Sequence, residues 1–165
     1  MVLDVLIAQA RASLELPLQV GQAAPFGDTD APLITQLPTW LWIDPAVWAP
    51  RSASTPPVFG VFVTATATPV NVTFANDAGD GVNCGANVGP AYNFALDDSQ
   101  QDSPCTLTYK HSTAVGAHSL TTTLTWDVNY ACSAFCGSGA LPGFTITTSR
   151  DVRVAEIQAI ATANP

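Results

Sequence analysis

The sequence has few charged residues, and basic residues are the scarcest. Only 11% of its 165 residues are charged, and five Lys and Arg stand against thirteen Asp and Glu, for a formal net charge of −8. Such a surface repels a phosphate backbone, so we expect no nucleic-acid partner. Lys110 is the only lysine and no G-x-x-x-x-G-K-[ST] loop occurs, so the sequence offers no nucleotide-binding motif.

Long apolar runs are also missing. No stretch approaches the roughly 18 to 20 apolar residues that span a bilayer, so we expect no membrane span. The first ten residues carry Asp4 and lack both a basic leader and a small-residue cleavage site. An even number of cysteines nevertheless suits export. We therefore expect a secreted or cell-surface protein whose export signal is absent from these residues, with a cytosolic protein as the alternative.

Residues for catalysis or metal binding are sparse. The two histidines, His111 and His118, lie apart from the cysteines, and no G-x-S-x-G elbow occurs, so we predict neither an enzyme nor a bound cofactor. One stretch, NDAGDG, offers two carboxylates for calcium, Asp77 and Asp80. It lacks EF-hand spacing and a closing Glu, so a plain turn is the favoured interpretation and calcium the alternative.

Alternating hydrophobicity dominates what is present. From residue 120 to 130 the even positions are apolar or Thr, with Trp126 among them, and the odd positions are all polar. This period of two is typical of a half-buried strand. We predict that it is a central strand with Trp126 in the core.

The N-terminal part follows another pattern. Apolar residues at three-and-four spacing predict a short amphipathic helix over residues 2–13, which docks either on the same chain or on a partner. Alternation over residues 14–20, broken by Pro17, predicts an edge strand. Residues 21–38 are rich in Gly, Pro and Asp and predict an irregular connector. We therefore divide the chain into residues 1–38 and a β domain at 39–165.

About seven strands without intervening helices are predicted in the second part, which favours an antiparallel β-sandwich. We expect a tight turn at residues 67–69, a hairpin that joins 106–110 to 120–130, and a turn at 149–151. The expected strands are residues 39–43, 58–66, 69–75, 106–110, 120–130, 144–148 and 152–157.

Four cysteines permit three pairings into two disulfides. Cys84 and Cys105 bracket a long polar loop, residues 85–104, that would be costly to order without a tether. A disulfide between them would contribute on the order of 3 kcal/mol by restricting the unfolded chain. We predict this pair, and a small local ring closed by Cys132 and Cys136.

Three of the four tryptophans, Trp40, Trp42 and Trp48, lie within nine residues. They are either an aromatic platform for sugar rings or large side chains that fill the core. We expect a non-enzymatic structural or protein-interaction domain of the cell envelope or secretome, with a protein partner. The alternative is a module that binds cell-wall polysaccharide through these tryptophans or through the loop 84–105.

The order of several motifs resembles the PKD domain, an Ig-like β-sandwich: Phe74, then Gly79 to Gly81, then Tyr109 with His111, Gly116, and the strand from Leu120 to Val128. Over nearly its whole length the chain is also similar to exported actinobacterial proteins that are uncharacterised or labelled "ATP/GTP-binding". The resemblance implies export and a PKD-like fold, and it implies no established activity. The residues that carry the longer resemblance are Ala12, Leu14, Leu16 and Pro17; Pro38, Trp40 and Trp42; Gly79 to Gly81, Cys84, Pro104, Cys105 and Tyr109; Thr123, Thr125, Trp126 and Val128; and Val154, Glu156, Gln158 and Ala159.

Overall fold

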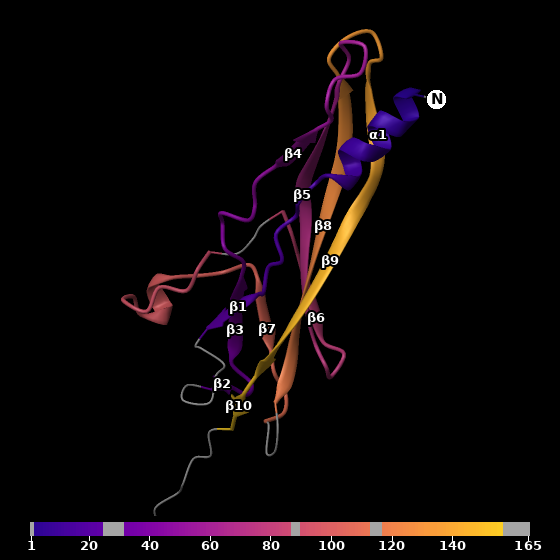
Figure 1. Cartoon of the computed structure of the whole chain (residues 1–165). Coiled ribbons are helices and arrows are strands. Elements are labelled where there is room, and N and C mark those ends of the chain that lie inside the picture. Colours follow the sequence, from indigo (N-terminus) through magenta and orange to yellow (C-terminus); the bar gives the residue numbers. More distant parts are fainter. Residues whose placement is uncertain (1, 25–31, 87–89, 113–116, 157–165) are drawn as a thin grey trace, which may run out of the picture.

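A computed structural model describes residues 2–24, 32–86, 90–112 and 117–156. The protein is mainly β, as predicted, and its strands are arranged around one long sheet (Figure 1). Within the described part of the chain, no helix is long and apolar enough to cross a membrane. The elements are α1 (Val2–Ala12), β1 (Gln22–Ala24), β2 (Leu33–Ile34), β3 (Pro38–Trp42), β4 (Arg51–Ser54), β5 (Val63–Asn76), β6 (Gly81–Gly85), the 3-10 helix η1 (Asp98–Gln100), β7 (Thr106–Thr108), β8 (His118–Cys132), β9 (Ser138–Val152) and β10 (Val154–Ala155).

Strand β8 is the centre of the long sheet, which confirms the strand predicted at residues 120–130. It pairs antiparallel with β5 on one side and β9 on the other, while β4 and β6 both pair with β5. The even positions of β8 face the core, and Trp126 is fully buried, as predicted. Asp127 and Asn129 on the opposite face are exposed.

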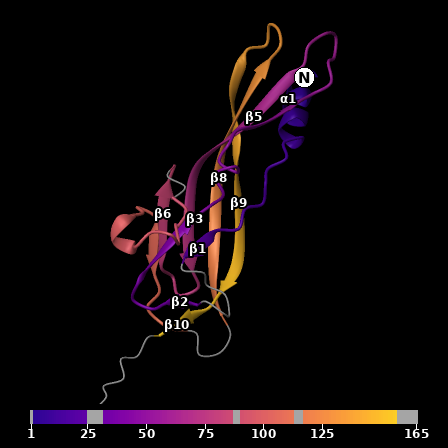
Figure 2. The same ribbon diagram turned by 90° about the vertical axis from the view of Figure 1, so that its left-hand side faces the viewer.

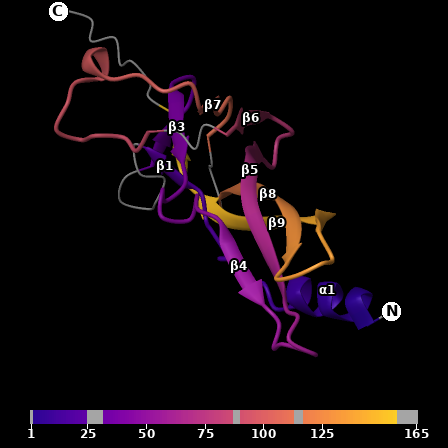
Figure 3. The ribbon, with the colours of Figure 1, turned by 90° about the horizontal axis from the view of Figure 1, so that it is seen from above.

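Two smaller sheets complete the fold. β1, β3 and β7 form an antiparallel three-stranded sheet, and β2 pairs in parallel with β10. The three-stranded sheet lies beside one half of the long sheet, and α1 lies beside the other half (Figures 1 and 3). Leu41, Leu107 and Tyr109 belong to the same buried cluster as Phe74 and Leu120 of the long sheet. One core therefore extends under both sheets.

The predicted N-terminal helix is confirmed, and it docks on its own chain. Leu6 and Ala10 are buried, and α1 packs on β4, β5 and β8. The buried face of β5 presents Ala65 and Ala67 in the same part of the sheet, and such small side chains let a helix approach closely. At the C-terminal end of the helix, the guanidinium of Arg11 lies 4.1 Å from the ring centre of Phe144.

The segment between α1 and β1 is not the predicted edge strand, because residues 14–20 pair with no strand. The chain crosses the buried face of the sheet at Gly21, whose amide donates to Thr122 Oγ1 at 3.1 Å. A Cβ at Gly21 would lie 2.7 Å from the Phe74 ring, so only glycine fits. The predicted connector, residues 21–38, is partly wrong because it contains β1 and β2; residues 25–31 lie outside the described residues.

The tight turn predicted at residues 67–69 is wrong, because β5 continues through it as one strand of 14 residues. A bulge between Pro69 and Asn71 absorbs the irregularity. β4 pairs with β5 only as far as Ala67, and β6 begins to pair at Val72. Pro69 has no backbone N–H to donate, and it lies between the parts of β5 that pair with β4 and with β6. No hydrogen bond to a neighbouring strand is therefore lost on that side.

Two further predictions of connectivity are wrong. The turn at residues 149–151 is part of β9, where Ser149 pairs with Thr121. Strand β7 does not form a hairpin with β8, because it pairs with β3 in the other sheet. The described part of residues 38–155 holds eight strands, β3 to β10, where about seven were predicted. The division at residue 38 stays a prediction; α1, β1 and β2 all pack or pair with later elements.

The buried Tyr109 makes the stability of the protein depend on pH. The side chain is 1% exposed, and its hydroxyl has no hydrogen-bond partner in the described structure. Burial raises the pKa of Tyr109 to about 12. Since the phenol ionises near pH 10 in the unfolded chain, its contribution to stability is complete below about pH 10 and disappears as the pH rises towards 12.

We therefore expect the free energy of unfolding to fall by about 2 kcal/mol across this window because of Tyr109 alone. Urea denaturation at a series of alkaline pH values would measure it. Tyr109→Phe should lack this component, and at neutral pH it should be no less stable, because it removes an unpaired buried hydroxyl. An identical alkaline loss in the Phe variant would contradict the assignment.

Candidate functional site

Trp40 lies on the outer side of the three-stranded sheet. Thr39 and Leu41 of β3 point to the core, so Trp40 and Trp42 lie on the opposite face and are half-buried. Trp40 is paired with Ala24 of β1 and Thr106 of β7. These small neighbours leave the indole room on its strand.

The long loop before β7 has its own network of hydrogen bonds. Gln101 Nε2 donates to the carbonyl of Asn93 at 3.1 Å, and the amide of Asn93 donates to Gln101 Oε1 at 3.0 Å. The short helix η1 begins after Asp97, whose amide donates to Gln100 Oε1 at 3.2 Å. A hydrogen bond of 2.6 Å from the Tyr92 hydroxyl to the Asp98 carboxylate fixes the aromatic ring to this helix.

The loop and β3 meet through aromatic rings. The rings of Trp40 and Tyr92 are 5.3 Å apart in an edge-to-face arrangement, and Phe94 packs on Tyr92 at 4.8 Å. A groove of about 370 Å³ opens between the loop and β3. We call it the aromatic groove; its lining includes Trp40, Tyr92, Asp98, Gln101, Asp102 and Ser103.

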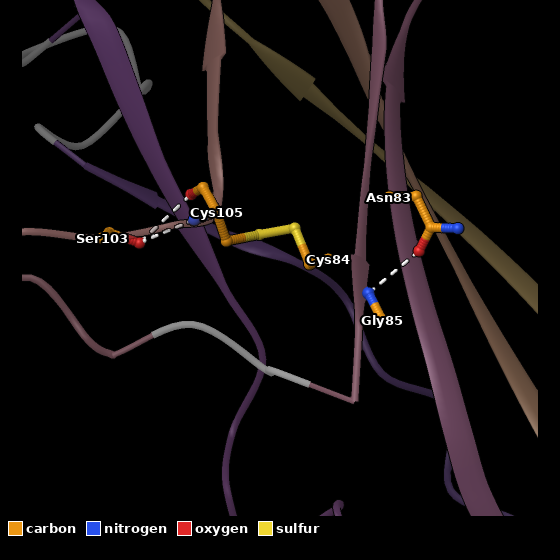
Figure 4. The surroundings of a disulfide bond; sticks show 5 residues. All are labelled: Asn83, Cys84, Gly85, Ser103 and Cys105. Carbon is orange, nitrogen blue, oxygen red and sulfur yellow. Dashed lines mark hydrogen bonds between the residues drawn. A yellow bond between two sulfur atoms is a disulfide. The ribbon is translucent and has the colours of Figure 1, made fainter.

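The predicted disulfide between Cys84 and Cys105 forms, with Cα atoms 5.4 Å apart, and it fixes the loop at its base (Figure 4). Cys84 belongs to β6 of the long sheet, and Cys105 immediately precedes β7 of the three-stranded sheet. The Ser103 hydroxyl accepts from the amide of Cys105 at 3.1 Å, which closes the loop end. The disulfide thereby joins the two sheets and orders the groove wall.

The electrostatics of the aromatic groove favour neutral or cationic ligands. Asp98 and Asp102 bring two carboxylates, and the described residues that line the groove include no Lys, Arg or His. The hydrogen bond to Asp98 raises the pKa of Tyr92, so the phenol stays protonated and keeps its donor role. Aromatic rings beside carboxylate, amide and hydroxyl groups can bind a polyhydroxylated ring, because the aromatic face contacts its apolar face and the polar groups bond its hydroxyls.

The structure separates the three predicted tryptophans. Trp40 lines the groove, and Trp42 lies on the same face of β3 but is not among the lining residues. Trp48 lies in the turn after β3, where it packs against the core cluster. Tyr92 was missed by sequence reasoning, although the aromatic pair Tyr92 and Phe94 inside a polar loop was a signal for it.

The two predicted calcium carboxylates lie in the turn between β5 and β6, and each has a basic partner. Asp77 is 2.9 Å from His118 Nδ1, and Asp80 is 3.1 Å from Lys110 Nζ. The hydrogen bond from Lys110 holds the pKa of Asp80 below its ordinary value. The described ranges contain no group of three or more His, Cys, Asp or Glu placed to hold a metal ion.

Comparison of the chain with protein-family models, with curated proteins and with solved structures gave no match. The PKD-like resemblance therefore stays a prediction.

Removal of the disulfide at the base of the groove has a calculable effect. Cys84→Ser/Cys105→Ser should lower the free energy of unfolding by about 3 kcal/mol, because the bond closes a circuit of 21 residues. Cys132→Ser/Cys136→Ser is the control, since that bond spans only 4 residues and should contribute about 2 kcal/mol or less. Chemical denaturation measures both, and a larger loss in the control would contradict the prediction.

Calcium is expected to leave the melting temperature unchanged at millimolar concentration. The carboxylates of Asp77 and Asp80 are engaged by His118 and Lys110, and calcium requires six to eight oxygen ligands. Differential scanning calorimetry with calcium and with chelator tests this. A rise of several degrees that Asp77→Asn abolishes would show that the turn binds calcium.

Proposed function

We propose that the chain is a non-enzymatic extracellular module that binds a neutral polysaccharide in the aromatic groove. The expected alternatives were a structural or protein-interaction domain and a polysaccharide-binding module. The contact between Trp40 and the disulfide-tethered loop favours the polysaccharide-binding module. The tryptophan cluster and the loop were separate candidates in the sequence, and Trp40 and the loop form one concave surface in the structure. This contact is the observation that carries the proposal.

The chemistry of the groove supports a sugar ligand. Sugar rings with equatorial hydroxyls have flat apolar faces that pack on indole and phenol rings, while their edges need hydrogen-bond partners. Asp98, Asp102 and Gln101 supply such partners beside Trp40 and Tyr92. The same carboxylates argue against a nucleotide or another anion, and hence against the nucleotide label of the resembling proteins.

A binding role without catalysis is supported by the state of the ionisable groups. His118 would be the natural general base, yet Nδ1 contacts Asp77 at 2.9 Å and Nε2 contacts the carbonyl of His111 at 2.9 Å. Neither ring nitrogen is left to activate a hydroxyl in this arrangement. His118 instead stacks beside Tyr109, with ring centres 5.7 Å apart, and connects β8 to the chain after β7.

The proposal includes an Ig-like, PKD-like sandwich and an extracellular location. Support for the fold comes from two antiparallel sheets that share one core and are joined by Cys84 and Cys105. Support for the location comes from the two disulfides, which persist in oxidising compartments.

Pull-down on insoluble cellulose, chitin and peptidoglycan tests the proposed function. The wild-type protein should bind at least one of them, and Trp40→Ala should weaken that binding about tenfold, because one stacking ring is worth roughly 1 kcal/mol or more. Trp42→Ala is the matched control, since this tryptophan shares the strand and the face but does not line the groove.

The control should bind as the wild type does. Two results would overturn the proposal: a wild-type protein that binds none of the three polymers, or equal losses in the Trp40 and Trp42 variants. Circular dichroism of each variant checks that the strand pairing is intact.

A further inference from the structure

The far end of the long sheet carries two exposed apolar loops. One is the turn at residues 58–61 that leads into β5, and the other is the disulfide ring at residues 132–136 between β8 and β9. The N-terminal end of α1 lies beside them (Figures 1 and 2). We call these two loops the apolar tip.

Each loop of the apolar tip holds one phenylalanine completely in solvent. Phe59 is 97% exposed and Phe135 is 108% exposed, and the exposed Val2 of α1 lines the same hollow. A shallow apolar hollow of about 290 Å³ lies between the loops and the helix. Exposed aromatic side chains in a cluster indicate a surface that is covered by something apolar.

Both phenylalanines occupy backbone positions that disfavour them. Phe59 has φ of 51° and Phe135 has φ of 60°, in the left-handed region that glycine and asparagine prefer. Gly60 follows with φ of 79°, so the turn has two consecutive positive φ values, for which Asn-Gly is the usual sequence. Turn formation therefore does not explain Phe59, and strain of this kind points to a function for the side chain.

The parts of the strands nearest to the apolar tip carry no charged side chain. Residues 52–76 and residues 128–149 include no Asp, Glu, Lys, Arg or His. The nearest charged side chain on the first two turns of α1 is Asp4. In a chain with net charge −8, these long uncharged stretches let the two loops enter an apolar medium without ionised side chains of their own.

Hydrogen bonds close the base of each loop of the apolar tip. Val58 and Val61 exchange hydrogen bonds of 2.8 and 3.0 Å, and the amide of Cys132 donates to Gly137 at 2.9 Å. The two loops are also joined to each other, since the amide of Ser133 donates to the carbonyl of Phe62 at 3.0 Å. These bonds pair the backbone at the base of each loop, which holds the two phenylalanines in fixed positions at its end.

The size of the tip distinguishes between kinds of partner. Nine residues line its hollow, whereas a stable interface between folded proteins takes about 20 to 30 residues on each side. A bilayer needs no shape complementarity and accepts a small apolar surface. We propose that the apolar tip inserts Phe59 and Phe135 into the hydrocarbon boundary of a lipid membrane. The long sheet then stands away from the surface, with the three-stranded sheet beside its farther half (Figure 1).

Flotation with phosphatidylcholine vesicles tests this insertion. The wild-type protein should float with the vesicles, and Phe59→Asn and Phe135→Asn should each lower the partition coefficient about tenfold, because each removes one large apolar side chain from lipid. Phe59→Asn should at the same time raise the melting temperature, because it creates Asn-Gly in the turn. Weaker binding by a more stable protein cannot be a consequence of unfolding.

Leu18→Ser is the matched control, because Leu18 is 78% exposed and lies outside the tip. It should leave the partition coefficient unchanged. Replacing half of the lipid with phosphatidylglycerol should weaken binding at low salt, since the protein is acidic. The inference is overturned by a wild type that does not float, by binding that needs anionic lipid, or by equal losses in the control. Lipid-free dimerisation that the Asn variants abolish would also overturn it, by assigning the tip to a second copy of the chain.

Discussion

The bond between Cys84 and Cys105 is the constraint on which the arrangement of the site depends. It connects β6 of the long sheet to the residue before β7 of the three-stranded sheet, and among the described residues no other disulfide joins these two layers. The same bond anchors both ends of the loop that carries Tyr92. The bond therefore fixes the position of the groove at β3 relative to the core, which includes Phe74 and Tyr109.

The strongest sequence signals showed which face of a strand or helix is buried, and these predictions were confirmed. Alternation identified β8 and placed Trp126 in the core, and three-and-four spacing identified α1. The pairing of the strands was not predictable in this way. Alternation with a period of two shows which face of a strand is buried, but it does not show which strand lies next to it. β7 accordingly pairs with β3 rather than β8. Pro69 suggested a turn, yet a local bulge with no neighbour on its amide side lets β5 continue.

The candidate sites were foreseen only in part, for the same reason. Trp40 and the disulfide-closed loop were each recognisable as features, but their contact joins residues about fifty positions apart in the sequence and needs the fold. The apolar tip was less visible. Its residues form an ordinary turn and a small ring, and only the structure shows that Phe59 and Phe135 project from neighbouring loops. β3 and the loop that form the groove lie beside the half of the long sheet that is away from the tip, so one surface can contact a polymer while the other contacts a membrane (Figure 1).

The most direct test of a ligand groove held by the disulfide is nuclear magnetic resonance of the indole N–H groups during titration with soluble oligosaccharides of glucose and N-acetylglucosamine. The chain has four tryptophans, so four such signals are expected. Our account predicts a saturable shift of the Trp40 signal, with smaller changes in Trp42, Trp48 and Trp126, and loss of this response when Cys84 and Cys105 are replaced by serine. A Trp40 signal that does not respond, or responds equally without the disulfide, would contradict it.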